Sequence, residues 1–481
     1  MKKTILFLSI IIFSSCTKIL EEVPKSFIAP ENYYQNEKDA EGAIIGVYSS
    51  NFINSSYINF NALHTDYALA RGSFTSLGNF SQVIASDQIG RVNGFWTDCY
   101  VTINRANVVL DRVPQIVDIN ENTRTRILAE ACFLRAFSYF ALLKDFGPVP
   151  LRTSETTGTT EKEVPRATVD QVNELMINDL LIAENDLPET VGNETGKASK
   201  WTAKMLLAAV YLNKEDWSKA AEKADEVIMS NNFSLVEVTK SDDFYNIFAT
   251  ITNPELIFAY HQSQTRLSDF VQWYHGAGTP YNRGNVWGFT NLPDMNSPII
   301  QNWDINDLRL DFNLYSSYIG DNGVLVILPP SDTQWRFKKW IKDPNGYATY
   351  SVPIYRYAEA FLTYAEASCM AEGSPSNLAL ERLNVIRRRA YGYNPNLNSP
   401  VDFPTGMSKD EFRNKVLQER AYEFFFEGGI QWWDLRRTNL AKEVIEASGK
   451  PFTNYRLLYP IPLAEIENNP AINQTDQNPG Y

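Results

Sequence analysis

The chain has 481 residues, of which 44% are hydrophobic and 21% are charged, values that are ordinary for a globular protein. Its formal net charge of −13 argues against nucleic acid as a partner. The three histidines and four cysteines show no spacing typical of a zinc site, so we expect neither a metal nor a cofactor. Cys132 and Cys369 lie in helical segments and are expected to be buried free thiols.

Residues 1–15 have the pattern of a secretory signal: a basic start, a short apolar run and then small residues. The run is too short to span a bilayer, which takes about 20 apolar residues. Cys16 follows two serines, an arrangement that resembles a bacterial lipobox, where the cysteine becomes the mature N-terminus and carries acyl chains. An ordinary signal peptide that happens to contain a cysteine is the alternative. Residues 16–36 are expected to form an extended tether.

Helical periodicity dominates the rest of the chain. In residues 201–212 and 217–228, apolar side chains recur at helical spacing on either side of a short break. Two such helices with alanines at their contact are typical of a tetratricopeptide-like hairpin. Further helices are predicted at 126–144, 356–372 and 377–390. The predicted fold is therefore mostly α-helical, with tetratricopeptide-like hairpins that form a scaffold, long loops and a few short β-hairpins.

Four long segments without helical periodicity interrupt this scaffold, at residues 49–95, 145–170, 231–350 and 391–407. Loops of this length usually carry function or short strands of their own. Residues 324–328 (VLVIL) are predicted to form a hairpin strand. Ligand binding, if the sequence reveals it, is expected in these segments.

Residues 269–291 form the densest aromatic stretch, and residues 64–80 form a second one. A flat ring covers the apolar face of a sugar, while nearby amide, carboxylate and guanidinium groups bond its hydroxyls. The candidate ligand-binding residues are Trp273, Tyr274, Tyr281, Asn282, Arg283 and Trp287 in the first stretch, and Asp66, Tyr67, Arg71, Phe74 and Asn79 in the second. The alternative for each ring is that it packs its loop onto the helices, and we expect Trp96 to lie in the core.

Several longer motifs are more specific. They are FLRAFSYFALLKDFGPVPL (133–151), RYAEAFLTYAEA (356–367), LNVIRRRA (383–390), LQERAYEFFFEGGIQWWDLRR (417–437) and the closing QNPGY (477–481). Together they resemble the SusD/RagB family, outer-membrane nutrient-binding lipoproteins of Bacteroidetes-type bacteria. Where the family usually has an arginine before the aromatic pair, this chain has Gln431, and it has an extra residue between Gly428 and Trp432.

Charged residues in the last long motif lie among Phe, Trp and Leu. They are Glu419, Arg420, Glu423, Asp434 and Arg436. An unpaired buried charge costs several kcal/mol, so these side chains are expected to be paired. We interpret them as an ion network that holds helices together, in preference to a catalytic acid pair.

The resemblance implies a function and a division of the chain. It implies an N-terminal helical region at 37–230 and a C-terminal region at 231–481, with a loop-rich ligand-binding insert at about 260–350. In the family, ligand-contacting loops come from both aromatic stretches. The implied protein is not an enzyme. It binds glycans, is anchored through Cys16 on the exterior of the outer membrane, and delivers its ligand to a SusC-like TonB-dependent transporter.

Three other functions stay open at this point. The same scaffold could bind peptides or other nutrients, as RagB-like members do. A helical-repeat scaffold could bind only protein. A hydrolase is a further alternative, although the chain contains no nucleophile-elbow or phosphate-loop motif that would indicate one.

Overall fold

The computed structural model describes residues 33–50, 55–78, 80, 83–156, 163–248, 250–261, 279, 291–320, 322–329, 335–339 and 351–481. The helices in chain order are α2 (Glu37–Ser49), α3 (Ser55–Leu63), α4 (Ser86–Arg112), α5 (Glu121–Phe146), α6 (Val169–Asp186), α7 (Lys200–Asn213), α8 (Trp217–Met229), α10 (Pro298–Gln301), α11 (Leu308–Asn313), α12 (Tyr357–Glu372), α13 (Asn377–Ala390), α14 (Lys409–Glu423), α15 (Ile430–Arg437), α16 (Ala441–Ala447) and α17 (Leu463–Asn468). The strands are β1 (Ala68–Ala70), β2 (Leu256–His261), β3 (Asn291–Pro293), β4 (Leu314–Tyr315), β5 (Ser317–Ile319), β6 (Leu325–Ile327), β7 (Arg336–Phe337) and β8 (Ser351–Arg356). The fold is thus mostly α-helical, as predicted.

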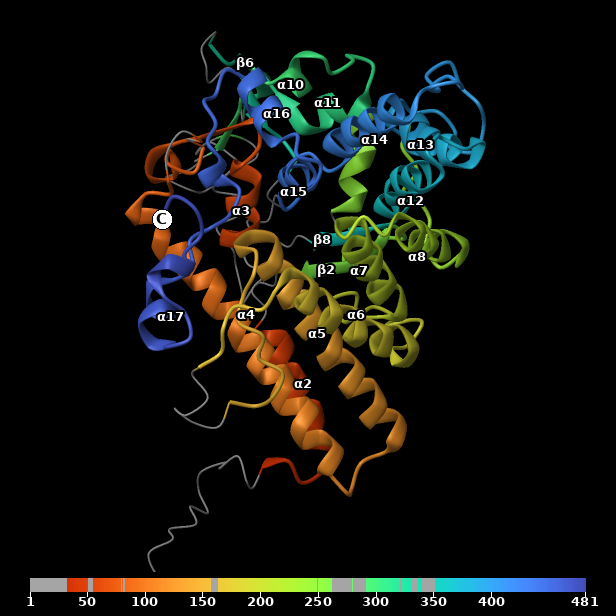
Figure 1. The fold of residues 1–481 in the computed structure, drawn as a ribbon. Helices are drawn as coiled ribbons and strands as arrows, with labels where there is room; N and C mark the ends of the chain where they lie inside the picture. Colours follow the sequence, from red (N-terminus) through yellow and green to blue (C-terminus); the bar gives the residue numbers. More distant parts are fainter. Residues whose placement is uncertain are drawn as a thin grey trace, which may run out of the picture.

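Consecutive helices pack side by side in one continuous stack. Helix α4 packs on α5, α5 on α6, α6 on α7 and α7 on α8. The stack then continues with α12, which packs on α8 and also on α13 and α14. Figure 1 shows α7, α8 and α12 as neighbours. The chain therefore leaves the stack after α8 and rejoins it at α12.

The segment between α8 and α12 is closed at its stem by a pair of strands. Strand β2 pairs antiparallel with β8, from Leu256 opposite Arg356 to His261 opposite Ser351. Strand β8 runs directly into α12. The strand pair thus returns the chain to the stack at the point where it left.

Side chains at the helix ends explain where several helices begin and end. Helix α7 begins at a capping box in which the Ser199 hydroxyl accepts from the backbone N–H of Thr202. Helix α14 begins at the same motif, with Ser408 and Glu411. Helix α12 ends at Gly373, whose φ of +78° suits the left-handed turn that closes a helix.

The core follows the predicted apolar stripes. In α12, Ala358, Leu362, Ala365 and Cys369 are fully buried, and in α8 Ala220, Ala224 and Val227 are fully buried. The predicted hairpin is confirmed by the packing of α7 on α8. The free thiols of Cys132 and Cys369 are buried, and Trp96 lies in the core with 4% of its surface exposed.

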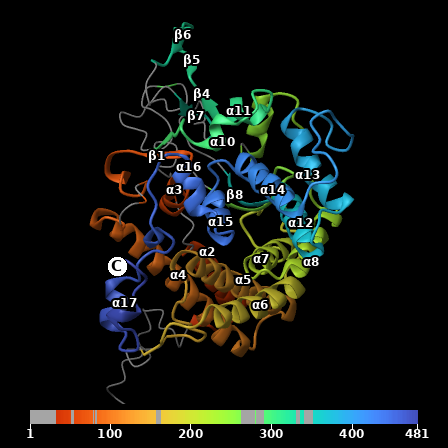
Figure 2. The same cartoon turned by 45° about the horizontal axis from the view of Figure 1, so that its top comes forward.

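Short two-stranded sheets lie outside the helical stack. Strand β1 pairs with β3, β4 with β7 and β5 with β6, all antiparallel. Strand β6 confirms the hairpin strand predicted at 324–328, and Figure 2 shows the β5–β6 hairpin projecting from the rest of the ribbon. Within the described ranges, no helix is both long and apolar enough to cross a bilayer.

Candidate functional site

The β1–β3 ladder joins the two aromatic stretches that the sequence singled out. Ala70 in the stretch 64–80 pairs with Asn291, the last residue of the stretch 269–291. Because the strands are antiparallel, Arg71 and the residues that precede Asn291 leave the ladder at the same end. The structure therefore joins the last residue of one predicted ligand-binding stretch to the other stretch.

Asp66 and Tyr67 lie in the core and not at a surface. The Asp66 carboxylate accepts hydrogen bonds from the Ser297 hydroxyl and, at 2.9 Å, from Nε2 of Gln431. Burial raises the pKa of Asp66, and these two hydrogen bonds oppose that effect. The Tyr67 ring packs on Phe425, with centroids 4.3 Å apart. Both side chains are fully buried, so the expectation that they contact a ligand is corrected. They anchor the start of the stretch 64–80 in the core instead.

Lys450 ties the start of the same stretch to β3. Its ammonium donates to the backbone oxygens of Asp66 and Ala68, at 2.6 and 2.8 Å, and pairs with Asp294 at 3.1 Å. Lys450 thus connects the segment 66–68, Asp294 and its own segment next to the β1–β3 ladder.

Arg71 and Phe74, further along the same stretch, differ in exposure. Arg71 is exposed directly after β1. Phe74 is 4% exposed, and the guanidinium of Arg91 lies 4.7 Å from its ring centroid. Because a covered ring cannot stack on a sugar, the assignment of Phe74 as a ligand contact is also corrected, whereas the role of Arg71 as a ligand contact stays a prediction.

The remaining predicted site residues lie outside the described residues. They are Asn79, Trp273, Tyr274, Tyr281, Asn282, Arg283 and Trp287, together with the proposed lipidation site Cys16. Their roles stay predictions.

Residues of β4, β5 and β7 lie beside the ladder and were not singled out from the sequence. Strand β3 contacts β7, and in the β4–β7 pair Tyr315 lies opposite Arg336. The rings of Tyr315 and Tyr318 meet edge to face at 6.3 Å. Burial and the nearby charge of Arg71 lower the pKa of Arg336. The sequence signal for these positions was that they lie in the loop-rich insert at about 260–350, next to the strand predicted at 324–328.

The predicted ion network is confirmed. Glu423 pairs with Arg356 at 2.8 Å and with Arg389 at 2.5 Å, and Arg309 pairs with Glu419 at 2.6 Å. Further along the motif, Arg420 pairs with Asp434 at 2.7 Å and Arg436 with Asp145 at 3.3 Å. Burial would raise the pKa of Glu423, but the surrounding guanidinium groups outweigh it and lower the pKa. Each of these charged side chains takes part in a buried ion pair, so their role is structural.

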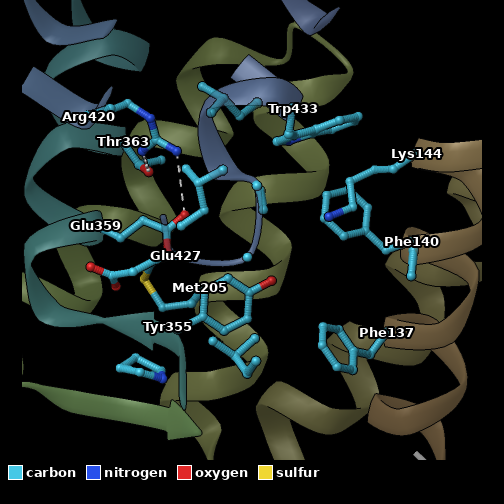
Figure 3. Close-up of a pocket in the computed structure, with 18 of the residues that line it drawn as sticks. Phe137, Phe140, Lys144, Met205, Tyr355, Glu359, Thr363, Arg420, Glu427 and Trp433 are labelled. Atoms are coloured by element: carbon cyan, nitrogen blue, oxygen red, sulfur yellow. Dashed lines mark hydrogen bonds and ion pairs between the residues drawn. The ribbon is translucent and has the colours of Figure 1, made fainter. Parts of the chain in front are cut away.

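Separate from the ladder, the helical stack encloses a cavity of about 100 Å³. Its walls come from α3, α5, α7, β8, α12, α14, the turn before α15 and α15 itself. Figure 3 shows the side chains of Phe137, Phe140, Met205, Tyr355 and Trp433 around it. No cluster of His, Cys, Asp and Glu that could hold a metal ion occurs among the residues that the structure describes.

Comparisons with known proteins agree with this geometry. A family profile described as "SusD family" matches residues 313–481, and one described as "Starch-binding associating with outer membrane" matches residues 20–212. The chain is 29% identical to SusD-like protein P2 of Formosa agariphila, with 96% of each chain covered. It is 25% identical to the starch-binding protein SusD of Bacteroides thetaiotaomicron, with 79% of this chain and 76% of the relative covered.

Solved structures share the fold. A SusD homologue from Bacteroides thetaiotaomicron superposes with a TM-score of 0.80 at 23% identity, covering 94% of this chain and 98% of the homologue. A laminarin-binding SusD-like protein superposes with a TM-score of 0.73 at 22% identity, covering 93% of this chain and all of that protein. The family profiles at both ends of the chain, the full-length relatives and the shared fold together show that this chain belongs to the SusD/RagB family.

Proposed function

We propose that this protein is a non-catalytic glycan-binding lipoprotein of the outer membrane that captures oligosaccharides at the β1–β3 ladder. The observation that carries the proposal is the pairing of Ala70 with Asn291, which joins the two aromatic stretches. The names of a starch-binding and a laminarin-binding relative support a glycan as the ligand class.

The proposed site combines rings from one stretch with polar groups from both. Trp273, Tyr274, Tyr281 and Trp287 supply flat faces for the apolar side of a sugar ring. Asn79, Asn282, Arg283 and the exposed Arg71 supply hydrogen bonds to its hydroxyls. Ion pairing occupies the buried acids of the 417–437 motif, which supports binding without catalysis.

The proposal extends to the protein's location and partner. Acyl chains on Cys16 would hold the protein on the outer membrane, because each buried CH₂ contributes about 0.8 kcal/mol. Anchored there and facing the exterior, it would pass its ligand to a SusC-like TonB-dependent transporter. A tethered binder works at an effective concentration near the mM range, so modest affinity suffices. A Cys16→Ser variant tests the anchor, since it should leave the membrane fraction while the folded protein keeps its ligand affinity.

Glycan titration of the purified protein tests the binding site. We expect it to bind laminarin- or starch-type oligosaccharides without shortening them. Trp273→Ala and Trp287→Ala should each weaken glycan binding by about 1–3 kcal/mol. Tyr393→Ala, an exposed ring in the turn after α13, is the matched control and should leave affinity unchanged. Unaltered affinity in both tryptophan variants, with folding intact, would remove this site, and binding of peptides in place of glycans would change the ligand class.

A further inference from the structure

The cavity inside the helical stack contains a lysine that has no acidic partner. The Lys144 ammonium lies 4.9 Å from the ring centroid of Phe140 and 5.2 Å from that of Trp433. Among the described residues, no carboxylate lies within ion-pair distance of it and no acceptor takes a hydrogen bond from it. Figure 3 shows its ammonium directed into the cavity. Cation–π contacts stabilise the charge while leaving its N–H groups free to donate.

A second free donor enters the same space from β8. Tyr355 is 6% exposed, and Figure 3 shows its hydroxyl pointing into the cavity. That hydroxyl has no hydrogen-bond partner in the part of the chain that the structure describes. Burial raises the pKa of Tyr355 well above its ordinary value, so the hydroxyl stays protonated and can donate.

The acids that line the cavity are already neutralised. Glu359 pairs with Arg420 at 3.6 Å, and the same guanidinium pairs with Asp434 at 2.7 Å. The carboxylate of Glu427 pairs with Arg356 at 2.8 Å and also accepts a hydrogen bond from Lys339. Lys144 and Tyr355 are therefore donors in this cavity that have no hydrogen-bond acceptor among the described residues, and one of them is positively charged.

The rest of the wall is apolar. Phe137, Phe140 and Met205 are buried, while Lys144 and Trp433 are half-buried, so the rim of the cavity reaches the surface. An apolar cavity of roughly 150 Å³ can bind benzene, so a cavity of about 100 Å³ holds a head group and a short apolar body, and a larger body such as a ring extends into the open rim. A sugar suits this wall poorly, because most of its hydroxyls would lose water without gaining a partner.

We propose that this cavity binds a small organic carboxylate with an apolar body. The carboxylate accepts hydrogen bonds from Lys144 and Tyr355, and the body lies between Phe137, Phe140 and Trp433. A charge-assisted hydrogen bond in a water-poor cavity is stronger than one between neutral groups, so Lys144 contributes most to recognition. The cavity is distinct from the β1–β3 ladder, and this proposal does not depend on glycan binding.

Fluorine NMR of the full-length protein with two probes tests the proposal. The probes are 4-fluorobenzoate and its neutral counterpart of the same shape, 4-fluorobenzamide. We expect the benzoate to bind about tenfold more tightly than the amide, because only the benzoate forms charge-assisted hydrogen bonds. Unlabelled benzoate should displace the fluorinated probe from the wild-type protein, and unlabelled benzamide should need about a tenfold higher concentration to do so. Absence of binding by the wild-type protein, or equal binding of the two probes, would overturn the proposal.

Four variants locate the site. Lys144→Met removes the ammonium group, keeps an unbranched side chain one atom shorter, and should weaken benzoate binding about tenfold, while Tyr355→Phe should weaken it several-fold. Ala209→Trp, on the α7 wall, should fill the cavity and abolish binding. Lys442→Met removes an exposed lysine from α16 and is the matched control, with unchanged binding expected. Full binding by a folded Lys144→Met or Ala209→Trp variant would place the probe elsewhere and overturn the assignment.

Discussion

Nε2 of Gln431 donates a 2.9 Å hydrogen bond to Oδ1 of Asp66, and both side chains are buried. The family usually has an arginine at this position, so the sequence departs from the pattern at a contact that fixes residues 64–80, the stretch predicted to bind a ligand. In this chain the neutral amide of Gln431 donates to one oxygen of the Asp66 carboxylate. The other oxygen accepts a hydrogen bond from the Ser297 hydroxyl. Lys450, which donates to the backbone of the same segment, already supplies a cation beside it.

Gln431→Ala should lower the free energy of unfolding by about 1–3 kcal/mol, because it leaves a buried carboxylate oxygen without its donor. Chemical denaturation measures the change. Gln474→Ala, at an exposed position, serves as the control and should change stability by no more than about 0.5 kcal/mol. Equal stability of the two variants would show that this hydrogen bond contributes nothing net.

Gly429→Ala should be far more damaging than Gly428→Ala. Both glycines have positive φ, +60° at Gly428 and +75° at Gly429, which costs an alanine about 1–2 kcal/mol. Only at Gly429 would a Cβ meet a neighbour, 2.3 Å from the Cβ of Asn61 and 2.6 Å from its backbone carbon. That clash should add about 1–3 kcal/mol to the loss of stability. Thermal unfolding of the two variants side by side decides the point, and an equal loss would contradict the close approach of α3 to the turn before α15.

Low pH should lower the free energy of unfolding because Glu366 becomes protonated. The Glu366 carboxylate pairs with Arg437 at 2.6 Å and with Arg413 at 3.1 Å. Burial alone would raise the pKa of Glu366, but these two guanidinium groups lower it from 4.5 to about 2. Between those values the unfolded chain binds more protons than the folded one. The contribution of Glu366, about 3 kcal/mol, is therefore present above pH 4.5 and lost as the pH falls toward 2.

Unfolding measured from pH 6 down to about pH 2 tests this dependence. Glu366→Gln should be less stable than the wild type at neutral pH and should lose less stability across the acid range. Glu411→Gln, at an exposed capping position of α14, is the comparison for a carboxylate outside the buried network. A parallel loss of stability in Glu366→Gln and the wild type would assign the acid sensitivity to other groups.

Arg71→Ala should weaken glycan binding without loss of stability. Its side chain is exposed beside the point where Ala70 pairs with Asn291, so its removal affects the proposed site and leaves the core intact. A loss of about 1 kcal/mol in the free energy of binding is expected for one hydrogen-bonding group. Calorimetric titration measures it, with the exposed Arg105→Ala in α4 as the control. If both variants bind like the wild type, Arg71 lies outside the site.

The sequence predicted the scaffold well because helices are encoded locally. Residues 201–212 and 217–228 carry their own apolar stripes and short turn, and they form α7 and α8. The buried charges were also predictable, since arginine and glutamate among aromatic residues have few stable alternatives to pairing.

The site was harder to predict because burial of a loop depends on distant residues. Asp66 and Tyr67 stand in a polar, Gly-containing stretch whose composition is the same whether it faces water or the core. Their burial is decided by Gln431 and Phe425, and Phe74 is covered by Arg91 from α4. The cavity around Lys144 is likewise assembled from several helices, and no single stretch of the sequence indicates it.

The contact between α8 and α12 also bears on how such proteins diversify. Helices α8 and α12 are neighbours in the stack but are separated in the chain by a long excursion. Strands β2 and β8 pair where this excursion begins and ends. Residues of that excursion outside the buried contacts of Arg309, Trp303 and Lys339 can be exchanged while the helices on both sides keep their neighbours. Under the proposed function, changes confined to those residues alter ligand preference without altering the scaffold.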